Sequence, residues 1–270
     1  IAAFEFGPAE RGVEASRHRG PDARGVVGHH GVVLGHARLA VVDVDRRSDQ
    51  PFVVGRTTLS YNGEVWNHAV LRRELEALGR QFRTSGDTEV VATVLDQWGW
   101  EGLGRLDGMF AAAWTTGDGR LWLARDRFGE IPLHYVPSGA ASELKVLQAA
   151  RLPGPAAYVP PGGVVVLAKG KAPAVRAFHA NGQPEQFSGS FEDAVAGVRR
   201  ALSQGVSDRT MADVPVCTLL SGGLDSTAVA WAAAQVMPAL VAYTAVQDTK
   251  SSDLKAARLA AAAIGIELRE

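Results

Sequence analysis

The sequence contains little that would tie it to a membrane, a nucleic acid or an oxidising compartment. A single cysteine among these 270 residues leaves no partner for an internal disulfide and is typical of a reducing cytoplasm. The formal net charge of −1 gives no electrostatic reason to expect a nucleic-acid partner. Charges, glycines or prolines interrupt every long apolar stretch, which argues against a membrane span. The composition therefore favours a cytoplasmic globular protein, and the length suits two domains.

The most informative segment lies near residue 220. An apolar run ends in the sequence Ser-Gly-Gly-Leu-Asp-Ser at 221–226, and an alanine-rich stretch follows at 228–236. We expect a buried strand over 214–220 and a helix after the loop. Two glycines allow the backbone to approach an anion closely, and the first N–H groups of the helix point at it. The segment therefore predicts a phosphate-binding loop.

Asp225 distinguishes this loop from other phosphate-binding turns. A carboxylate repels phosphate unless a cation lies between them, so Asp225 predicts a Mg²⁺ ion. The loop contains no lysine and does not fit the pattern Gly-x-x-x-x-Gly-Lys-Ser/Thr. It resembles the loop of the ATP pyrophosphatase superfamily, whose members hold pyrophosphate while ATP adenylates a substrate. The alternative is a glycine-rich turn in which Asp225 is a helix N-cap.

The residues after the loop predict an α/β arrangement. Apolar runs at 239–246 and from Ile266 onward favour two further strands, and the alanine-rich segment 254–264 favours a helix between them. Alternating strands and helices are typical of a doubly wound parallel sheet. Such a sheet binds its ligand at the carboxyl ends of the strands.

The first 180 residues carry a different pattern. Short apolar runs separated by turns predict strands at 32–34, 39–44, 57–61, 110–115, 121–125 and 164–168. Apolar residues at helical spacing predict helices over 67–78 and 89–98. Many strands with two helices favour an α+β sandwich of sheets and helices. We therefore expect two domains, residues 1–182 and residues 190–270, on either side of a polar linker.

Two spacings in the first half look short for such a sandwich. Few residues separate the opening segment from Arg17, fewer than a helix before Arg17 would need. The run from His134 to Gly139 leads into Ala140 with no returning strand. These spacings suggest that loops are omitted at both places.

Polar clusters follow several of the predicted strands. Each has a plain structural interpretation: 62–63 as a turn, Asp87 as a helix N-cap, and 125–127 as an ion-paired strand end. Six motifs nevertheless occur in order before the loop at 221–226. They are Arg17 to Asp22, His36-Ala-Arg-Leu-Ala-Val-Val-Asp43, Tyr61-Asn-Gly-Glu-Val-Trp-Asn67, Ser85-Gly-Asp-Thr-Glu89, Arg125-Asp-Arg-Phe-Gly129 and Ala141-Ser-Glu-Leu-Lys145. Together they resemble the glutamine-hydrolysing asparagine synthetase family, which includes the β-lactam synthetases.

This resemblance implies an N-terminal-nucleophile glutaminase domain followed by an ATP-dependent synthetase domain, with ammonia passing from the first to the second. It implies a glutamine site formed by Arg38, Asn62, Gly63, Glu64 and Asp87. A guanidinium such as that of Arg38 can pair with the substrate α-carboxylate, and Asp87 or Glu64 can take its α-ammonium group. Asn62 and the Gly63 N–H group can donate to the oxyanion that develops on the substrate amide.

The resemblance also implies an ATP site in the second domain. Pyrophosphate and Mg²⁺ would be bound by Ser221, Gly222, Gly223, Asp225 and Ser226, with Asp225 as the metal ligand. Leu219 and Val246, at the ends of predicted strands, would contact the nucleotide. The alternative for these two apolar residues is a plain core position.

The family's glutaminase nucleophile is a cysteine at the mature N-terminus, in a start that resembles Met-Cys-Gly-Ile-Ala. The sequence opens with Ile1-Ala2-Ala3, which corresponds to the residues just after that cysteine. Cys217 cannot replace it, because Cys217 precedes the phosphate loop in the other domain, where we expect it to be a small buried residue. We therefore expect the nucleophile before Ile1, with its own α-amino group as the base.

Three functions stay open on the sequence. The first is an asparagine synthetase-like amidotransferase that uses glutamine and an acceptor carboxylate, aspartate or a related acid. The second is a β-lactam synthetase-like ligase with a vestigial glutaminase domain, and the third is a non-catalytic module that binds nucleotide or glutamine. The presence of Arg38, Asn62, Gly63 and Asp87 favours the first. Family analogy further implies a homodimer.

Overall fold

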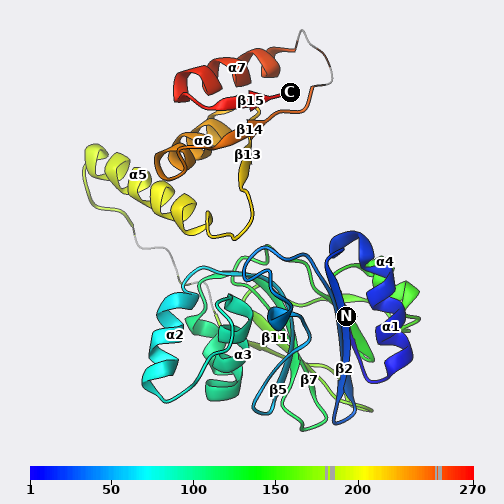
Figure 1. The fold of residues 1–270 in the computed structure, drawn as a ribbon. Helices are drawn as coiled ribbons and strands as arrows, with labels where there is room; N and C mark the ends of the chain where they lie inside the picture. The colour runs from blue at the N-terminus through cyan, green and yellow to red at the C-terminus, as the bar shows by residue number, and fades with distance from the viewer. Residues whose placement is uncertain (180–181, 183–185, 247, 249–250) are drawn as a thin grey trace. The chain divides into compact units, whose positions relative to one another are not determined.

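The structure is a computed structural model, and it describes residues 1–179, 182, 186–246, 248 and 251–270. The chain divides into two compact units, unit 1 (residues 1–182) and unit 2 (residues 183–270), which are described separately (Figure 1). Among the residues described, no helix combines the length and the apolar character that crossing a membrane requires.

Unit 1 contains two six-stranded sheets. The strands of the first sheet are β1 (Ala2–Ala3), β2 (Ala23–His29), β3 (Val32–Arg38), β8 (His134–Val136), β9 (Gly139–Ala141) and β10 (Ala157–Tyr158). Those of the second are β4 (Phe52–Val54), β5 (Thr57–Val65), β6 (Gly108–Thr115), β7 (Leu121–Arg125), β11 (Gly163–Leu167) and β12 (Ala174–Ala177). The strand orders are β10-β8-β9-β1-β3-β2 and β12-β11-β7-β6-β5-β4. Neighbouring strands run antiparallel in both sheets.

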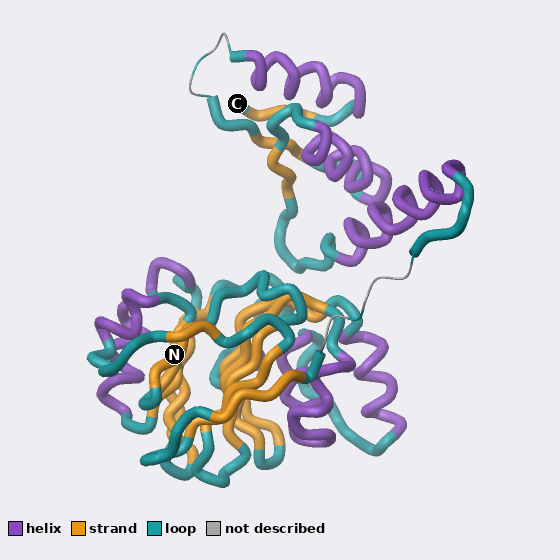
Figure 2. The backbone as a smooth tube through the Cα atoms, turned by 180° about the vertical axis from the view of Figure 1, so that it is seen from behind, coloured by secondary structure: helices purple, strands orange, loops and turns teal. Residues whose placement is uncertain are grey.

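Helices cover the outer face of each sheet, so that unit 1 has four layers. Helices α1 (Phe6–Ala15) and α4 (Leu144–Ala149) cover the first sheet, and α2 (His68–Ala77) and α3 (Asp87–Trp98) cover the second. Figure 2 shows the strands of this unit in the middle with helices on both sides. Three short 3₁₀ helices complete it: η1 (Arg17–Arg19), η2 (Arg46–Ser48) and η3 (Gly99–Arg105).

Strand β6 shows why the sequence forms this sandwich. Phe110, Ala112 and Trp114 belong to the core under α2 and α3, whereas Ala111 and Ala113 belong to the core between the two sheets. Successive side chains of a strand point to opposite faces, so both faces of β6 are apolar and both are covered. The predicted α+β sandwich is confirmed.

Unit 2 alternates helices and strands. Its elements are α5 (Phe191–Asp208), β13 (Cys217–Leu219), α6 (Leu224–Val236), β14 (Val241–Tyr243), α7 (Ser252–Ile264) and β15 (Glu267–Arg269). The three strands pair in parallel in the order β13-β14-β15. A small core joins the sheet to α6 and α7 through Leu220, Ala230, Ala242, Ala257 and Ala261. The predicted parallel α/β arrangement is confirmed for the described strands.

Three expectations about unit 1 are wrong. Residues 39–44 form a loop rather than a strand, because Asp43 has a positive φ of 46° and Arg38 binds main-chain carbonyl groups of the loop. The segment before Arg17 does form a ten-residue helix, α1. The run after Val136 does return as a strand, β9, which pairs with both β8 and β1. The helix and the returning strand are therefore both present despite the short spacings.

Candidate functional site

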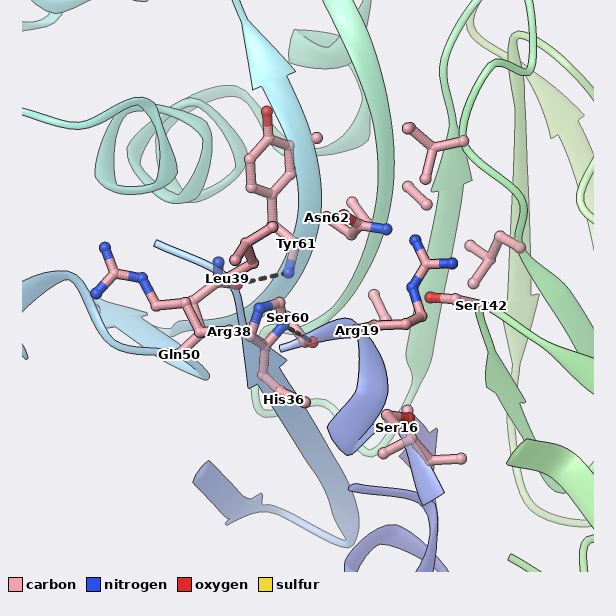
Figure 3. A pocket seen from close by; sticks show the side chains of 18 of the residues that line it. Ser16, Arg19, His36, Arg38, Leu39, Gln50, Ser60, Tyr61, Asn62 and Ser142 are labelled. Carbon is pink, nitrogen blue, oxygen red and sulfur yellow. Dashed lines mark hydrogen bonds between the residues drawn. The ribbon is translucent and has the colours of Figure 1, made fainter. Parts of the chain in front are cut away.

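A cavity of about 250 Å³ lies in unit 1. Strand β3 ends at its wall, β5 crosses it, and α3 begins beside it (Figure 3). All five residues predicted to bind glutamine line this one cavity, and they come from these three elements: Arg38, Asn62, Gly63, Glu64 and Asp87. The fold therefore brings together residues that the sequence separates into three motifs.

Asp87 is the most tightly held of the five. It is 5% exposed, and its Oδ2 atom accepts hydrogen bonds from the Tyr61 hydroxyl at 2.8 Å and the Val65 N–H at 2.9 Å. Burial raises the pKa of the Asp87 carboxyl above its ordinary value, although both hydrogen bonds oppose this change. The carboxyl group is therefore fixed in position before any ligand arrives.

Glu64 lies near Asp87 on the same side of the cavity. Its Oε2 atom is buried and has no hydrogen-bond partner among the described residues. Burial, and secondarily the charge of Asp87, raises the pKa of Glu64 from 4.5 to about 8. Two carboxyl groups in one buried place disfavour each other's ionisation, and a cation between them would relieve this. This end of the cavity is therefore suited to a positively charged group.

Gly63 shows how closely β5 and β6 approach at the cavity. A Cβ atom on this residue would lie 2.1 Å from the Met109 carbonyl oxygen, so the position accepts only glycine. Asn62, the preceding residue, points into the cavity in Figure 3, and Arg19 approaches the same space from η1. Polar N–H donors thus face the cavity from two sides.

Arg38 closes one edge of the cavity and is 7% exposed. Its guanidinium group donates to the Asp49 carboxylate at 2.8 Å and to the Asp45 carbonyl oxygen at 3.0 Å. It also donates to the carbonyl oxygens of Val42, at 3.4 Å, and Asp43. Arg38 therefore holds the loop 39–49 against the cavity.

Asp43 attaches the same loop to the start of α3. Its Oδ2 atom accepts from the Ser85 N–H at 2.6 Å and from the Ser85 hydroxyl at 3.0 Å. These hydrogen bonds and that of Arg47 lower the pKa of the Asp43 carboxyl, in opposition to burial. The loop 39–49 is thus attached both to Arg38 at the end of β3 and to Ser85 just before α3.

Sequence reasoning gave no role to several residues at the cavity. His36 and Ser60, from neighbouring sheets, contact each other at its wall, and Arg19 pairs with Glu143 at 3.2 Å near its rim. His36 and Arg19 belong to two of the six motifs, so the sequence could have singled them out as site residues. Ser60 lies one residue before a motif, and nothing in the sequence predicts its contact with His36.

The predicted phosphate loop lies between β13 and α6 in unit 2. The hydroxyl oxygens of Ser221 and Ser226 lie 3.0 Å apart, and Ser226 also donates to the Gly223 carbonyl oxygen at 3.2 Å. Gly222 has a φ of 81°, and a Cβ atom there would lie 2.4 Å from the Ala257 nitrogen. The loop therefore needs glycine at 222, where only a residue without a side chain lets α7 pack against it.

The remaining residues predicted in unit 2 are exposed. Asp225 lies in the first turn of α6, where N–H groups have no acceptor within the helix. Leu219 is 77% exposed and Val246 is 38% exposed, so neither is a core residue of the described unit. Cys217 is exposed as well, contrary to the expectation of a small buried residue.

Comparison with known proteins identifies both parts of the chain. The family model described as a glutamine amidotransferase domain matches residues 7–158, and the one described as asparagine synthase matches residues 197–270. "Asparagine synthetase [glutamine-hydrolyzing] 3" of Bacillus subtilis is 35% identical over an alignment of 255 positions, and the match covers 82% of this chain and 41% of that protein. "Asparagine synthetase [glutamine-hydrolyzing] 2" of Arabidopsis thaliana is 37% identical over an alignment of 223 positions, and the match covers 79% of this chain and 37% of that protein.

A solved structure shows the same fold at lower identity. Glutamine phosphoribosylpyrophosphate amidotransferase from B. subtilis has a TM-score of 0.55 and 19% identity, and the match covers 97% of this chain and 62% of that chain. The present chain spans about two fifths of the length of the curated relatives it matches. On the family matches and the ordered motifs, the chain belongs to the glutamine-dependent asparagine synthetase family.

Proposed function

We propose that unit 1 is a glutaminase that releases ammonia from glutamine. The observation that carries this proposal is that five residues from three elements converge on one cavity. The buried carboxyl groups of Glu64 and Asp87 match the α-ammonium group of glutamine, and the guanidinium group of Arg38 matches its α-carboxylate. Arg38 would give up its longest hydrogen bond, the one of 3.4 Å to the Val42 carbonyl oxygen, when it binds the substrate.

The same cavity supports amide hydrolysis. We assign oxyanion stabilisation to the Asn62 side chain and the Gly63 N–H group, because donors fixed before reaction stabilise developing negative charge. The nucleophile is a cysteine thiol expected before Ile1, with its α-amino group as base. The thiol attacks the amide carbon, the C–N bond breaks to release ammonia, and water hydrolyses the thioester to glutamate. The glutaminase domain would comprise residues 1–182.

We propose that residues 190–270 form the beginning of an ATP-dependent synthetase domain. The loop fits such a ligand: Gly222 lets α7 pack closely against it, and Ser221, Gly223 and Ser226 offer polar groups at the N-terminus of α6. Asp225 would hold Mg²⁺ together with phosphate oxygens. Proteins commonly bind this ion with only one or two carboxylates, and the phosphates of the substrate supply further ligands. The ion would stabilise the negative charge of departing pyrophosphate. Leu219 and Val246 would contact the nucleotide.

Together the two units would serve one amide-forming reaction in the full-length protein. ATP adenylates an acceptor carboxylate with release of pyrophosphate, and ammonia displaces AMP to form the amide. The acceptor would be aspartate or a related acid. A cytoplasmic location, expected from the single cysteine, and a homodimer, expected by family analogy, stay predictions.

Glutamate release by the full-length protein tests the glutaminase directly. We expect release from glutamine, and Asp87→Asn should lower kcat/KM about 100-fold, because the substrate ammonium loses a charged, buried partner. The matched control is Asp107→Asn, at an exposed carboxyl group in the same unit. Pyrophosphate release without any glutamate release would instead favour the β-lactam synthetase-like ligase. Absence of both would favour the non-catalytic module.

A further inference from the structure

His36 and Ser60 form a hydrogen-bonded pair at the cavity that the proposed roles leave unused. His36 lies on β3 and Ser60 on β5, so the pair links the two sheets of unit 1. The His36 Nδ1 atom lies 3.1 Å from the Ser60 hydroxyl oxygen, and Figure 3 shows this bond beside the cavity. Both residues line the cavity.

The surroundings of Ser60 determine which ring nitrogen of His36 carries the proton. The Ser60 hydroxyl donates its single hydrogen to the Gly35 carbonyl oxygen at 3.1 Å. A carbonyl oxygen cannot donate, so the Ser60 oxygen is left as an acceptor for His36. On this arrangement we assign the hydrogen of the neutral ring to Nδ1, which leaves Nε2 with a lone pair.

The Nε2 atom is the part of the ring that remains available. None of the described residues donates a hydrogen bond to it, and it is not one of the enclosed polar atoms of the described chain. Burial lowers the pKa of His36 to about 3, so the ring stays neutral at physiological pH. The cavity thus contains a fixed hydrogen-bond acceptor without a charge.

We propose that His36 binds the amide nitrogen of the substrate, with Nε2 accepting a hydrogen bond from the amide –NH₂ group and from the ammonia that it becomes. This inference rests on the proposed glutaminase function. The acidic end of the cavity, at Glu64 and Asp87, suits the other end of an amino acid, which leaves His36 for the side-chain amide. Arg38 is unsuited to that task, because a guanidinium group can only donate.

An acceptor at this place also distinguishes glutamine from its product. The amide group of glutamine presents N–H hydrogens, whereas the side-chain carboxylate of glutamate presents only oxygen lone pairs. A carboxylate oxygen opposite the Nε2 lone pair would be repelled, so glutamate would bind weakly and leave. Sites that pair with a substrate N–H group discriminate strongly against analogues that lack it.

His36→Asn provides the main test in the full-length protein. The asparagine amide nitrogen can replace Nδ1 as the donor to Ser60, but nothing replaces Nε2. We expect kcat/KM for glutamine to fall about 30-fold and the ratio of the glutamate inhibition constant to the glutamine KM to fall about tenfold. His36→Gln, which can place an amide oxygen near the Nε2 position, should restore part of both. Thermal unfolding checks that each variant remains folded.

The matched control is His29→Asn. His29 makes a similar contact, with its Nδ1 atom 3.1 Å from the Thr58 hydroxyl oxygen, but it does not line the cavity. The His29→Asn substitution should leave kcat/KM for glutamine and inhibition by glutamate unchanged. Wild-type kinetics and glutamate inhibition in His36→Asn would overturn the inference and leave the glutaminase function intact. Absence of glutamine hydrolysis by the wild-type protein would overturn both.

The tautomer can be measured without turnover. Nitrogen-15 chemical shifts of the histidine ring distinguish a protonated Nδ1 from a protonated Nε2. We expect the Nδ1-protonated form for His36 across the pH range in which unit 1 is folded, and a mixture of forms in Ser60→Ala. A protonated Nε2 in the wild-type protein would overturn the assignment.

Discussion

The two candidate sites differ in what holds their residues in place. In unit 1 the site residues are buried or half-buried, and neighbours from other elements fix them, as Tyr61 fixes Asp87. In unit 2 the loop is exposed and is held by its own hydroxyl groups, with Asp225 open to solvent. A site that recognises a small amino acid gains from fixed, desolvated partners. A site for a phosphate ligand with its own cation needs mainly open N–H groups and space.

The largest effect is expected from a substitution of the exposed carboxylate, Asp225, in unit 2. Asp225→Asn retains the shape of the side chain but removes the charge that would hold Mg²⁺. We expect ATP-dependent pyrophosphate release by the full-length protein to fall about 1000-fold or more, since electrostatic stabilisation of the leaving group would be lost. Steady-state pyrophosphate assays with candidate carboxylates would measure this.

Asp253→Asn is the matched control for that change. Asp253 is also an exposed carboxylate in the first turn of a helix, α7, but lies outside the loop. Its replacement should leave pyrophosphate release unchanged. Equal loss in both variants would indicate a general effect of charge in unit 2 and would remove Asp225 from the metal role.

The contribution of an apolar side chain to stability should also differ between the two units. Leu123 on β7 is fully buried between the sheets of unit 1, whereas Leu224 at the start of α6 is 85% exposed. Leu123→Ala should lower the free energy of unfolding by about 2–5 kcal/mol, because it removes buried methyl groups and leaves a cavity. Leu224→Ala should change it by about 0.5 kcal/mol or less. Denaturant unfolding of the two variants gives both values.

A large loss in Leu224→Ala would have a specific meaning. It would show that Leu224 is covered in the protein as it exists in solution, so that unit 2 would be packed as unit 1 is. The comparison between a buried and an open site would then lose its basis. An unchanged free energy of unfolding in both variants would contradict the packing described for β7.

The sequence was sufficient for the elements whose pattern is local. The apolar run of β6 and the glycines of the loop at 221–226 predict their structure, because each depends on neighbours along the chain. Residues 39–44 carry the apolar composition of a strand but form a loop, since Arg38 takes the carbonyl groups of Val42 and Asp43. That interaction depends on a tertiary arrangement that no short pattern records.

The site was predictable to the same limited extent. The family resemblance singled out Glu64 and Asp87, but it did not supply the contact of Asp87 with Tyr61 or the buried position of the Glu64 Oε2 atom. Likewise, His36 belongs to a motif while its partner Ser60 does not. Residue identity follows from sequence, whereas protonation follows from neighbours that only the fold assembles.

The smallest expected effect concerns the pH dependence of unit 1. Free Glu64, with its pKa raised to about 8, holds a proton at pH 7. A bound α-ammonium group would favour the ionised carboxylate, so glutamine binding would release that proton. KM for glutamine should therefore fall as pH rises from about 6.5 to 8, by at most tenfold per pH unit. Glu64→Gln should remove this dependence, while Glu76→Gln, at an exposed position on α2, should retain it.

The stability of the protein without glutamine should decrease with pH, whereas its affinity for glutamine should increase. Because the folded state retains a proton on Glu64 that the unfolded chain loses above about pH 4.5, the free energy of unfolding should fall as pH rises from about 4.5 to 8. Glutamine should oppose this loss, since it binds the folded, ionised form. Denaturant unfolding with and without glutamine would therefore diverge as pH rises. A flat KM profile combined with a flat stability profile would mean that Glu64 is already ionised, and that a partner in solution satisfies its buried oxygen.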